Sequence, residues 1–327
     1  MVVSMEAHPK TYSHLRFGCR TDVGRRRSSN EDSLLCLPDQ GLFAVADGMG
    51  GAQAGEVASK LTVESVQQAF ARYHDRPGVN NLSRKRALLH EAANTACRKI
   101  QDVVRRNHLA QSGSTFAALC FDENQPDQGM ALHAGDSRAY RFRNGKVEQL
   151  TRDHSFTGRG NGATSSRHYG VLTRAIGVHP LVELEETRFD VAPGDLYLLC
   201  SDGLSNMVGP RQMLAVFANA QDATPEDLAI RLVQAANAQG GADNISVVIV
   251  EVRAHSMFDQ PRPTLAEPEG LDASVDGQAE TRELPTLPRD VPDPAPAAAP
   301  ARAVPRWLWL AGAAALLAAA GWFIAHH

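Results

Sequence analysis

The stretch Leu42-Phe-Ala-Val-Ala-Asp-Gly-Met-Gly-Gly51 places an aspartate at the end of an apolar run and follows it with a glycine-rich turn. Three other aspartates stand at the ends of similar runs: Asp136 in ALHAGDSRAY, Asp202 in LYLLCSDGLS and Asp243 in GGADNISVVIV. Apolar runs of this length are typical of buried strands, and the ends of strands can converge at one edge of a sheet. We therefore predict that these four carboxylates, which are far apart in sequence, meet in space.

Such a group of carboxylates would be unstable without cations, because like charges repel one another. Oxygen ligands suit Mg²⁺ or Mn²⁺, and the sequence has no clustered set of Cys or His that would favour zinc. The segment Arg27-Ser-Ser-Asn-Glu-Asp-Ser33 adds an arginine, whose guanidinium can hold a phosphate through two parallel hydrogen bonds. These residues predict a metal-dependent hydrolase that acts on a phosphate ester.

Seven short motifs surround these residues. In chain order they are Arg27-Ser-Ser-Asn-Glu-Asp32, Ala46-Asp-Gly-Met-Gly-Gly51, Gly113-Ser-Thr115, Gly135-Asp-Ser-Arg138, Leu172-Thr-Arg-Ala-Ile-Gly177, Ser201-Asp-Gly-Leu204 and Asp243-Asn244. At these motifs the chain resembles the metal-dependent protein serine/threonine phosphatases of type 2C, and more specifically the bacterial members of that family. The resemblance implies an α+β fold, a four-layer α/β/β/α sandwich of two antiparallel sheets flanked by helices.

The same resemblance implies a role for each matched residue. Asp47 would bridge two metal ions, Mn²⁺ or Mg²⁺, the carbonyl of Gly48 would bind one of them, and Asp202 and Asp243 would complete the site. Two adjacent ions can activate a water for direct attack on phosphorus, so no covalent phosphoenzyme is expected. Arg27 would bind the phosphate oxygens and stabilise charge in the transition state.

Other polar residues are expected to support this centre. Glu31, Asp32 and Asn244 would hold metal-bound waters or neighbouring ligands without binding a metal directly. Asp136 matches the position of a ligand to a third ion, which it would share with Asp202. The expected cofactors are therefore two or three divalent ions.

Two features depart from the family pattern. Animal members carry a histidine where this chain has Met49, which cannot donate a proton, so the general acid is unassigned. His154 is either a substitute for it or an ordinary structural histidine. Residues 156–171 (FTGRGNGATSSRHYGV) replace the usual flap and form either a substrate-facing loop or a solvated one.

Composition limits the classes of function. The first 254 residues carry 28 acidic and 28 basic side chains, so this part has no broad basic surface and nucleic acid is not an expected partner. The five cysteines are widely spaced, which suits reduced thiols in a cytosol. No apolar run occurs in residues 1–20, so we expect no secretory signal peptide.

The C-terminal part differs in composition from the rest. Residues 255–306 hold ten of the 18 prolines and nine acidic side chains, which predicts a disordered linker after a catalytic domain of residues 1–254. Residues 307–325 form a run of 19 residues without a charge, long enough as a helix to cross a bilayer core of about 30 Å. A buried core helix is the alternative. We expect a single-pass anchor in the cell inner membrane, with the catalytic domain cytoplasmic.

Periodicity predicts the elements of the first domain. Strands are expected at 14–23, 33–37, 42–46, 114–121, 129–135, 138–143, 186–191, 195–200 and 244–252, and helices at 53–73, 83–106, 210–218 and 225–239. The function that follows is hydrolysis of phosphoserine and phosphothreonine in cytoplasmic proteins, targets of a serine/threonine kinase. The alternative is a catalytically inactive pseudophosphatase that binds phosphoproteins.

Overall fold

A computed structural model describes residues 2–3, 12, 14–72, 81–109, 111–156, 171–218 and 223–254, all within one compact unit, Met1–Pro263. The linker expected at 255–306, the membrane helix expected at 307–325 and most of the 156–171 stretch lie outside the described residues. None of the helices in the described ranges is long and apolar enough to cross a membrane.

The first sheet has seven strands. Its path is β1 (Val2–Val3), β3 (Asp32–Leu37), β4 (Leu42–Met49), β6 (Phe116–Phe121), β7 (Gln128–Ala134) and β12 (Glu185–Asp190), and β5 (Gly113–Ser114) pairs with the end of β4. The pairings are antiparallel except for the short β1, which runs parallel to β3. The sheet is therefore antiparallel along its main length, as expected.

The second sheet has five antiparallel strands. Their order is β2 (Leu15–Asp22), β14 (Ile245–Val252), β13 (Leu196–Cys200), β8 (Arg138–Arg143) and β9 (Lys146–Gln149). A separate two-stranded ribbon pairs β10 (Ser155–Phe156) with β11 (Val171–Leu172). The neighbouring strands β14 and β13 are antiparallel, and Cys200 pairs with Val247. The chain segments before Ile245 and after Cys200 therefore lie side by side at the same end of these two strands.

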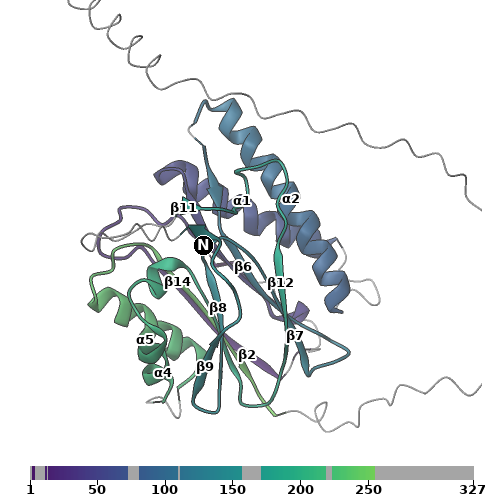
Figure 1. Ribbon diagram of the computed structural model, residues 1–327, viewed down its shortest axis with the longest axis vertical. Helices are drawn as coiled ribbons and strands as arrows, with labels where there is room; N and C mark the ends of the chain where they lie inside the picture. Colours follow the sequence, from purple (N-terminus) through teal and green to yellow (C-terminus); the bar gives the residue numbers. More distant parts are fainter. Residues whose placement is uncertain are drawn as a thin grey trace, which may run out of the picture. The chain divides into compact units, whose positions relative to one another are not determined.

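Helices cover the outer faces of both sheets (Figure 1). The helices α1 (Ala52–Ala71) and α2 (Leu82–Arg106) pack on the first sheet, and α4 (Pro210–Ala218) and α5 (Pro225–Ala238) pack on the second. Two shorter elements are the 3-10 turn η1 (Pro38–Gln40) and α3 (Asp202–Ser205). A third core lies between the sheets and contains Phe43, Tyr197 and Val248. The predicted four-layer arrangement is confirmed.

Local sequence explains where the long helices begin. Thr224 caps α5 by accepting a hydrogen bond from the Asp227 N–H, and the Asp227 side chain accepts from Thr224 in return. Pro225 follows at the first helical position, where its missing N–H costs nothing. Asn81 caps α2 by accepting from the Arg84 N–H.

The predicted helices and main strands are all present, with ends that differ by a few residues. The strands β1, β9, β10 and β11, the turn η1 and the short helix α3 were not predicted. Two-residue strands leave no periodic pattern, and β9 (KVEQ) is mostly exposed and lacks an apolar alternation.

Candidate metal and phosphate site

Asp47 and Asp32 form the centre of the site. They lie directly opposite each other on β4 and β3, so their side chains share one face of the sheet. The Ser201 hydroxyl donates to Oδ2 of Asp32 at 2.8 Å. The other oxygen, Oδ1 of Asp32, is buried and has no hydrogen-bond partner among the described residues. A buried carboxylate oxygen without a donor is costly, and a nearby cation would remove that cost.

Asp202 and Asp243 join this pair from the second sheet. The pKa of Asp47 is raised well above its usual range. Burial is the largest cause, followed by the charges of Asp32, Asp202, Asp136 and Asp243. Burial, followed by the charges of Asp136, Asp243 and Asp32, raises the pKa of Asp202 to about 7. The neighbouring carboxylates therefore act on both Asp47 and Asp202. Divalent cations would stabilise their ionised forms.

The chemistry of the ligand atoms decides which ions this group could hold. Among the described residues, the set of three ligand atoms that all lie within 4.8 Å of one another comes from His133, His154 and Glu185, and not from the aspartates. The donor set of the aspartates is all oxygen, which fits Mn²⁺ or Mg²⁺.

Gly48 follows Asp47 where α1 approaches the sheet. Its N–H donates to the Glu31 carbonyl at 3.1 Å, and a Cβ on Gly48 would lie 2.0 Å from the carbonyl oxygen of Gly55. Only glycine permits the first turn of α1 to pack this closely. The backbone of Gly48 is thereby held beside Asp47.

Arg27 reaches the carboxylates from an exposed turn. Its Nη2 donates to Oδ2 of Asp243 at 2.8 Å, and its Nη1 lies 3.8 Å from Oε1 of Glu31. The hydrogen bond to Asp243 is the main reason that the pKa of Arg27 is raised. With 46% of its side chain exposed, Arg27 can meet a ligand from solvent. The positively charged guanidinium of Arg27 therefore lies at the exposed edge of the negatively charged group.

Asn244 holds the segment that carries Arg27. Its Nδ2 donates to the carbonyls of Val23 at 3.0 Å and Ser29 at 2.8 Å, while its Oδ1 accepts from the Glu31 N–H at 2.8 Å. All the side-chain hydrogen-bonding groups of Asn244 thus fix the chain on both sides of Arg27. Burial is the first reason that the pKa of Glu31 is raised, although the charge of Arg27 opposes it.

Asp136 lies on a tight turn beside Asp47. Gly135 adopts a φ of 110°, and the Ser137 hydroxyl lies 2.7 Å from the Thr115 hydroxyl, whose oxygen accepts from the Asp47 N–H at 2.9 Å. Burial, followed by the charge of Asp153, raises the pKa of Asp136. The structure therefore brings Asp136 into the same group as Asp47.

His154 is buried, and its two ring nitrogens are both engaged. Nδ1 accepts from the Gly135 N–H at 3.2 Å, and Nε2 lies 2.9 Å from Oε2 of Glu185. Both ring nitrogens of His154 are therefore engaged by Gly135 and Glu185. Met49, at the position of the animal histidine, packs its methyl group toward Gly113.

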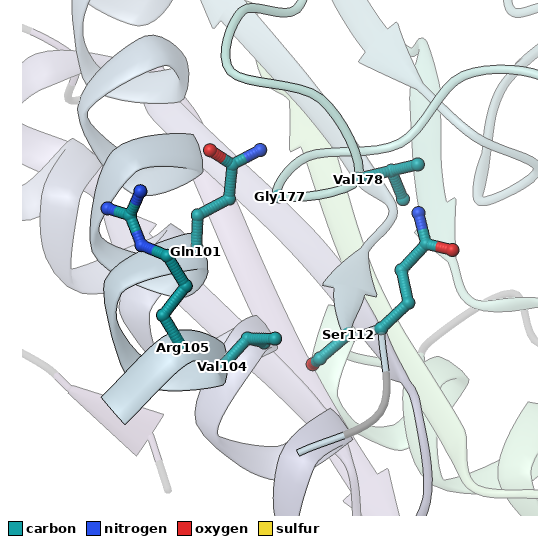
Figure 2. A pocket seen from close by; sticks show the side chains of 7 residues that line it. Gln101, Val104, Arg105, Ser112, Gly177 and Val178 are labelled. Atoms are coloured by element: carbon teal, nitrogen blue, oxygen red, sulfur yellow. The ribbon is translucent and has the colours of Figure 1, made fainter. Parts of the chain in front are cut away.

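A cavity of about 300 Å³ lies beside the end of α2 (Figure 2). Side chains from the end of α2 line one side and the 176–178 turn lines the other; the lining residues are Gln101, Val104, Arg105, Gln111, Ser112, Gly177 and Val178. Its Ser112 hydroxyl donates to the Met49 carbonyl at 3.2 Å and to the Ala54 carbonyl at 2.8 Å. None of the aspartates lines this cavity, so it flanks the carboxylate group without containing it.

Comparison with known proteins agrees with this geometry. The family described as Protein phosphatase 2C matches residues 23–235, which include every motif from Arg27 to Asp202. The chain belongs to the protein phosphatase 2C family.

Two relatives show how far this family membership extends along the chain. The serine/threonine protein phosphatase PstP of Mycobacterium tuberculosis is 35% identical over 260 residues, which cover 77% of this chain and 48% of PstP. The chain thus spans about half the length of that relative. The serine/threonine phosphatase stp of Listeria monocytogenes is 34% identical over 252 residues, which cover 71% of this chain and 94% of stp.

A solved structure adds the metal content of a relative. The catalytic domain of the serine/threonine protein phosphatase PstP, in complex with two manganese ions, superimposes with a TM-score of 0.60 and 34% sequence identity. The match covers 73% of this chain and 99% of that chain. The fold of the phosphatase 2C family therefore extends over the whole described unit.

Several residues of the site were not predicted from sequence. Thr115 and Ser201 lie within matched motifs but had no expected role, and the structure shows their hydroxyls bonded to Asp47 and Asp32. Glu185 and His133 lie in no motif. Their contacts with His154 depend on strand pairing, for which the sequence carries no local signal.

Proposed function

We propose that this chain is a metal-dependent phosphatase that removes phosphate from serine and threonine side chains of proteins. The observation that carries this proposal is the convergence of Asp32, Asp47, Asp136, Asp202 and Asp243 from both sheets beside an exposed arginine. The named relatives, which are serine/threonine phosphatases, support the same reaction.

The proposed metal ligands are Asp47, the Gly48 carbonyl, Asp202 and Asp243, with Asp136 as a ligand to a third ion. When bound, Mn²⁺ or Mg²⁺ ions supply hydroxide at neutral pH and offset the charge of a phosphate group. The two manganese ions in the PstP structure support this assignment. Asp32, whose Oδ2 is occupied by Ser201, would orient neighbouring groups.

Arg27 would bind the phosphate oxygens of the substrate. In the structure its guanidinium is bonded to Asp243, and an incoming phosphate would compete for the same donors. Arginine suits this exchange, since it offers two parallel donors to a tetrahedral anion and stays charged at any working pH. Asn244 and Glu31 would keep the arginine segment in place during that exchange.

The alternative is a pseudophosphatase that binds phosphoproteins without turnover. Loss of a metal carboxylate would favour it, and this chain retains Asp47, Asp202 and Asp243. Hydrolysis of p-nitrophenyl phosphate by the full-length chain with Mn²⁺, compared with the same assay in excess chelator, separates the two. We expect turnover that depends on the metal. Binding of a phosphopeptide by the Mn²⁺-loaded chain without any turnover would support the pseudophosphatase.

For the whole chain we propose a catalytic domain at residues 1–254, a linker at 255–306 and a membrane helix at 307–325. Tryptophans near both ends of the last segment, at 307, 309 and 322, and the flanking Arg302 and Arg306 support a cytoplasmic catalytic domain at the inner membrane. Fractionation of cells that express the full chain, or a chain that ends at residue 306, tests the anchor. Recovery of both forms in the soluble fraction would refute it.

We further propose that the substrates are cytoplasmic proteins phosphorylated by a serine/threonine kinase. The phosphatase reaction itself supports this, because its substrate must be made by a phosphoryl transfer to a hydroxyl side chain. Comparison of phosphoproteomes with and without the protein tests it. Phosphoserine and phosphothreonine sites should rise in occupancy when the protein is absent.

A further inference from the structure

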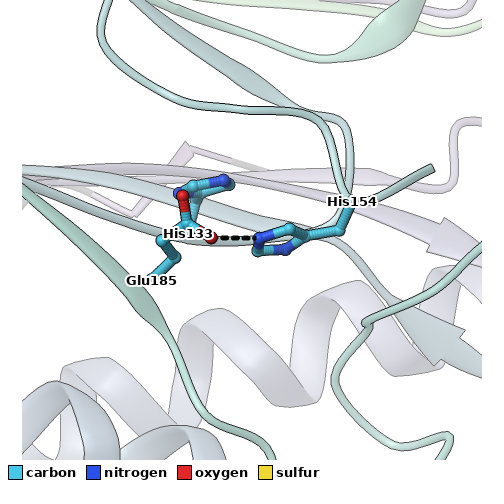
Figure 3. A group of neighbouring side chains, drawn as sticks. All are labelled: His133, His154 and Glu185. Atoms are coloured by element: carbon cyan, nitrogen blue, oxygen red, sulfur yellow. Dashed lines mark hydrogen bonds and ion pairs between the residues drawn. The ribbon is translucent and has the colours of Figure 1, made fainter.

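Two histidines and a glutamate form a compact group (Figure 3). Through His154 the group is bonded to Gly135, the residue before Asp136. His133 lies on β7, Glu185 lies opposite it on β12, and His154 precedes β10. One candidate ligand atom from each residue lies within 4.8 Å of the others, a spacing that a metal ion could also use. The hydrogen bonds and ring geometry of the group decide what it does.

The protonation of His154 is fixed by its neighbours. Nδ1 accepts the Gly135 N–H at 3.2 Å, so Nε2 carries the ring proton and donates it to Oε2 of Glu185 at 2.9 Å. That hydrogen bond is the main cause that lowers the pKa of Glu185. A metal on Nε2 would move the proton to Nδ1, where it would face the Gly135 N–H. A metal and the Gly135 hydrogen bond are therefore in conflict.

Ring geometry also disfavours a metal. The rings of His133 and His154 are stacked, with centroids 4.4 Å apart and planes at 13° to each other. Lone pairs that lie in two nearly parallel planes do not converge on one ion. Nε2 of His133 donates to the Arg152 carbonyl at 2.7 Å, which binds this ring to the same segment as His154.

The group is instead built around the backbone of Gly135. The His154 N–H donates to the Gly135 carbonyl at 2.9 Å, and the His154 ring accepts the Gly135 N–H. His154 therefore bonds both the carbonyl and the N–H of the Gly135 backbone. Gly135 has a φ of 110°, and a Cβ there would lie 2.7 Å from the Thr115 side chain. The turn is thus clamped between His154 on one side and Thr115 on the other.

Asp153, the residue before His154, bonds to the other end of the turn. Asp153 accepts two hydrogen bonds from Arg138, from Nε at 2.9 Å and from Nη2 at 2.6 Å. Gly135 and Arg138 are therefore both fixed by consecutive residues, and Asp136 lies between them. The position of the Asp136 carboxylate depends on this clamp.

We propose that His154 is a positioning residue that fixes the Asp136 turn and so sets the affinity of the ion that Asp136 would hold. The inference rests on the proposed function, because it takes Asp136 as a metal ligand. Side chains that orient a metal ligand typically change metal affinity by about 10- to 100-fold when they are replaced. Glu185 serves in this scheme as the acceptor that selects the ring tautomer of His154.

Two substitutions separate the hydrogen bonds of His154. In His154→Asn the amide oxygen takes the place of Nδ1 and can accept the Gly135 N–H, but Glu185 loses its donor. In His154→Gln the amide nitrogen takes the place of Nε2 and can donate to Glu185, but Gly135 loses its acceptor. Each variant loses one hydrogen bond, so similar unfolding temperatures are expected, and His108→Gln at an exposed site is the matched control.

Titration of Mn²⁺ into each full-length variant, followed by calorimetry, tests the proposal. Asp136→Asn should weaken or remove one class of Mn²⁺ sites. His154→Gln should weaken that class by about 10-fold or more, whereas His154→Asn should stay within about threefold of wild type. Equal affinities in the Asn and Gln variants, or unchanged Mn²⁺ binding by Asp136→Asn, would overturn the proposal.

Glu185→Gln decides between a hydrogen-bonding and a metal-binding role for the group. The glutamine oxygen still accepts from His154, so we expect the number of bound Mn²⁺ ions to stay the same. Loss of one ion in this variant would mean that the group itself binds metal, and the proposal would be wrong. Hydrolysis of p-nitrophenyl phosphate by the wild type is measured separately. Its absence would refute the phosphatase function, while the titration would still decide the role of His154.

Discussion

Nη2 of Arg27 donates a 2.8 Å hydrogen bond to Oδ2 of Asp243, which joins two residues that are 216 positions apart in the chain. The proposed phosphate-binding group is thus bonded to a proposed metal ligand. Because the arginine is held by a carboxylate when no substrate is present, its position in the site is set before phosphate arrives. If both proposed roles hold, the same contact would couple metal binding to phosphate binding.

Replacement of Asp243 by asparagine should abolish hydrolysis. The change removes one negative charge from the carboxylate group and one acceptor from Arg27, so both the ions and the arginine lose a partner. Outer partners of metal sites alone alter affinity by about 10- to 100-fold, so loss of a direct ligand should exceed that range. Asp47→Asn should behave in the same way. Turnover of p-nitrophenyl phosphate near the wild-type rate in either variant would contradict the assignment.

Replacement of Arg27 by lysine should lower kcat/KM without removing metal binding. Lysine keeps the charge but offers no paired donors, and a hydrogen bond to a charged group is worth about 1.5 to 3 kcal/mol, or about 10- to 150-fold. Phosphopeptide kinetics measure this loss, and Arg26→Lys on the same exposed turn is the matched control. If Arg27→Lys retains full kcat/KM, the guanidinium does not bind phosphate.

The metal-free protein should lose stability as pH rises. Burial and neighbouring carboxylates raise the pKa of Asp202 to about 7 and, with burial again the largest cause, that of Asp32 to about 6, both from 3.8. A carboxyl with a raised pKa in the folded state binds its proton more tightly when folded. Its stabilising effect is therefore complete below pH 3.8 and disappears as pH rises through about 6 to 7.

Thermal unfolding in excess chelator, between about pH 5 and pH 8, measures this effect. We expect the unfolding temperature to fall across the range. Mn²⁺ should oppose the fall, because ions favour the ionised carboxylates and bind more tightly at higher pH. Asp202→Asn should flatten the metal-free curve. An unfolding temperature that rises with pH without metal would show that the carboxylates do not share one site.

A chain that ends after residue 254 should fold and remain active. The last strand ends at Val252, and the Arg253 N–H donates to the His14 carbonyl at 2.8 Å, so the described fold closes before residue 255. Circular dichroism and p-nitrophenyl phosphate assays of this fragment, against the full-length chain, test the expectation. Aggregation of the fragment, or loss of its Mn²⁺ response, would show that residues beyond 254 belong to the fold.

The carboxylate group was predictable from sequence because its members stand at the ends of apolar runs. Asp47 and Asp202 end such runs, and buried strands place their ends at sheet edges by a general rule. The four-layer order of helices and sheets could be predicted only from the resemblance to the phosphatase family. Periodicity identifies a strand but not its partner, so the pairing of β4 with β6 and of β13 with β8 could not be derived from it.

The supporting residues were harder to predict for a physical reason. Glu185 lies in the half-exposed strand EETRFD, and its bond to His154 exists only because β12 pairs with β7 in one register. Period-2 alternation alone does not specify that register. The same holds for Ser201, whose hydroxyl meets a carboxylate 169 positions away.

Asn244 has a consequence for the speed of each catalytic cycle. By bonding Val23, Ser29 and Glu31 together, it immobilises the arginine segment once, when the chain folds. A segment already ordered in this way loses little further conformational entropy when a phosphorylated side chain binds, so more of the binding free energy remains available to the transition state.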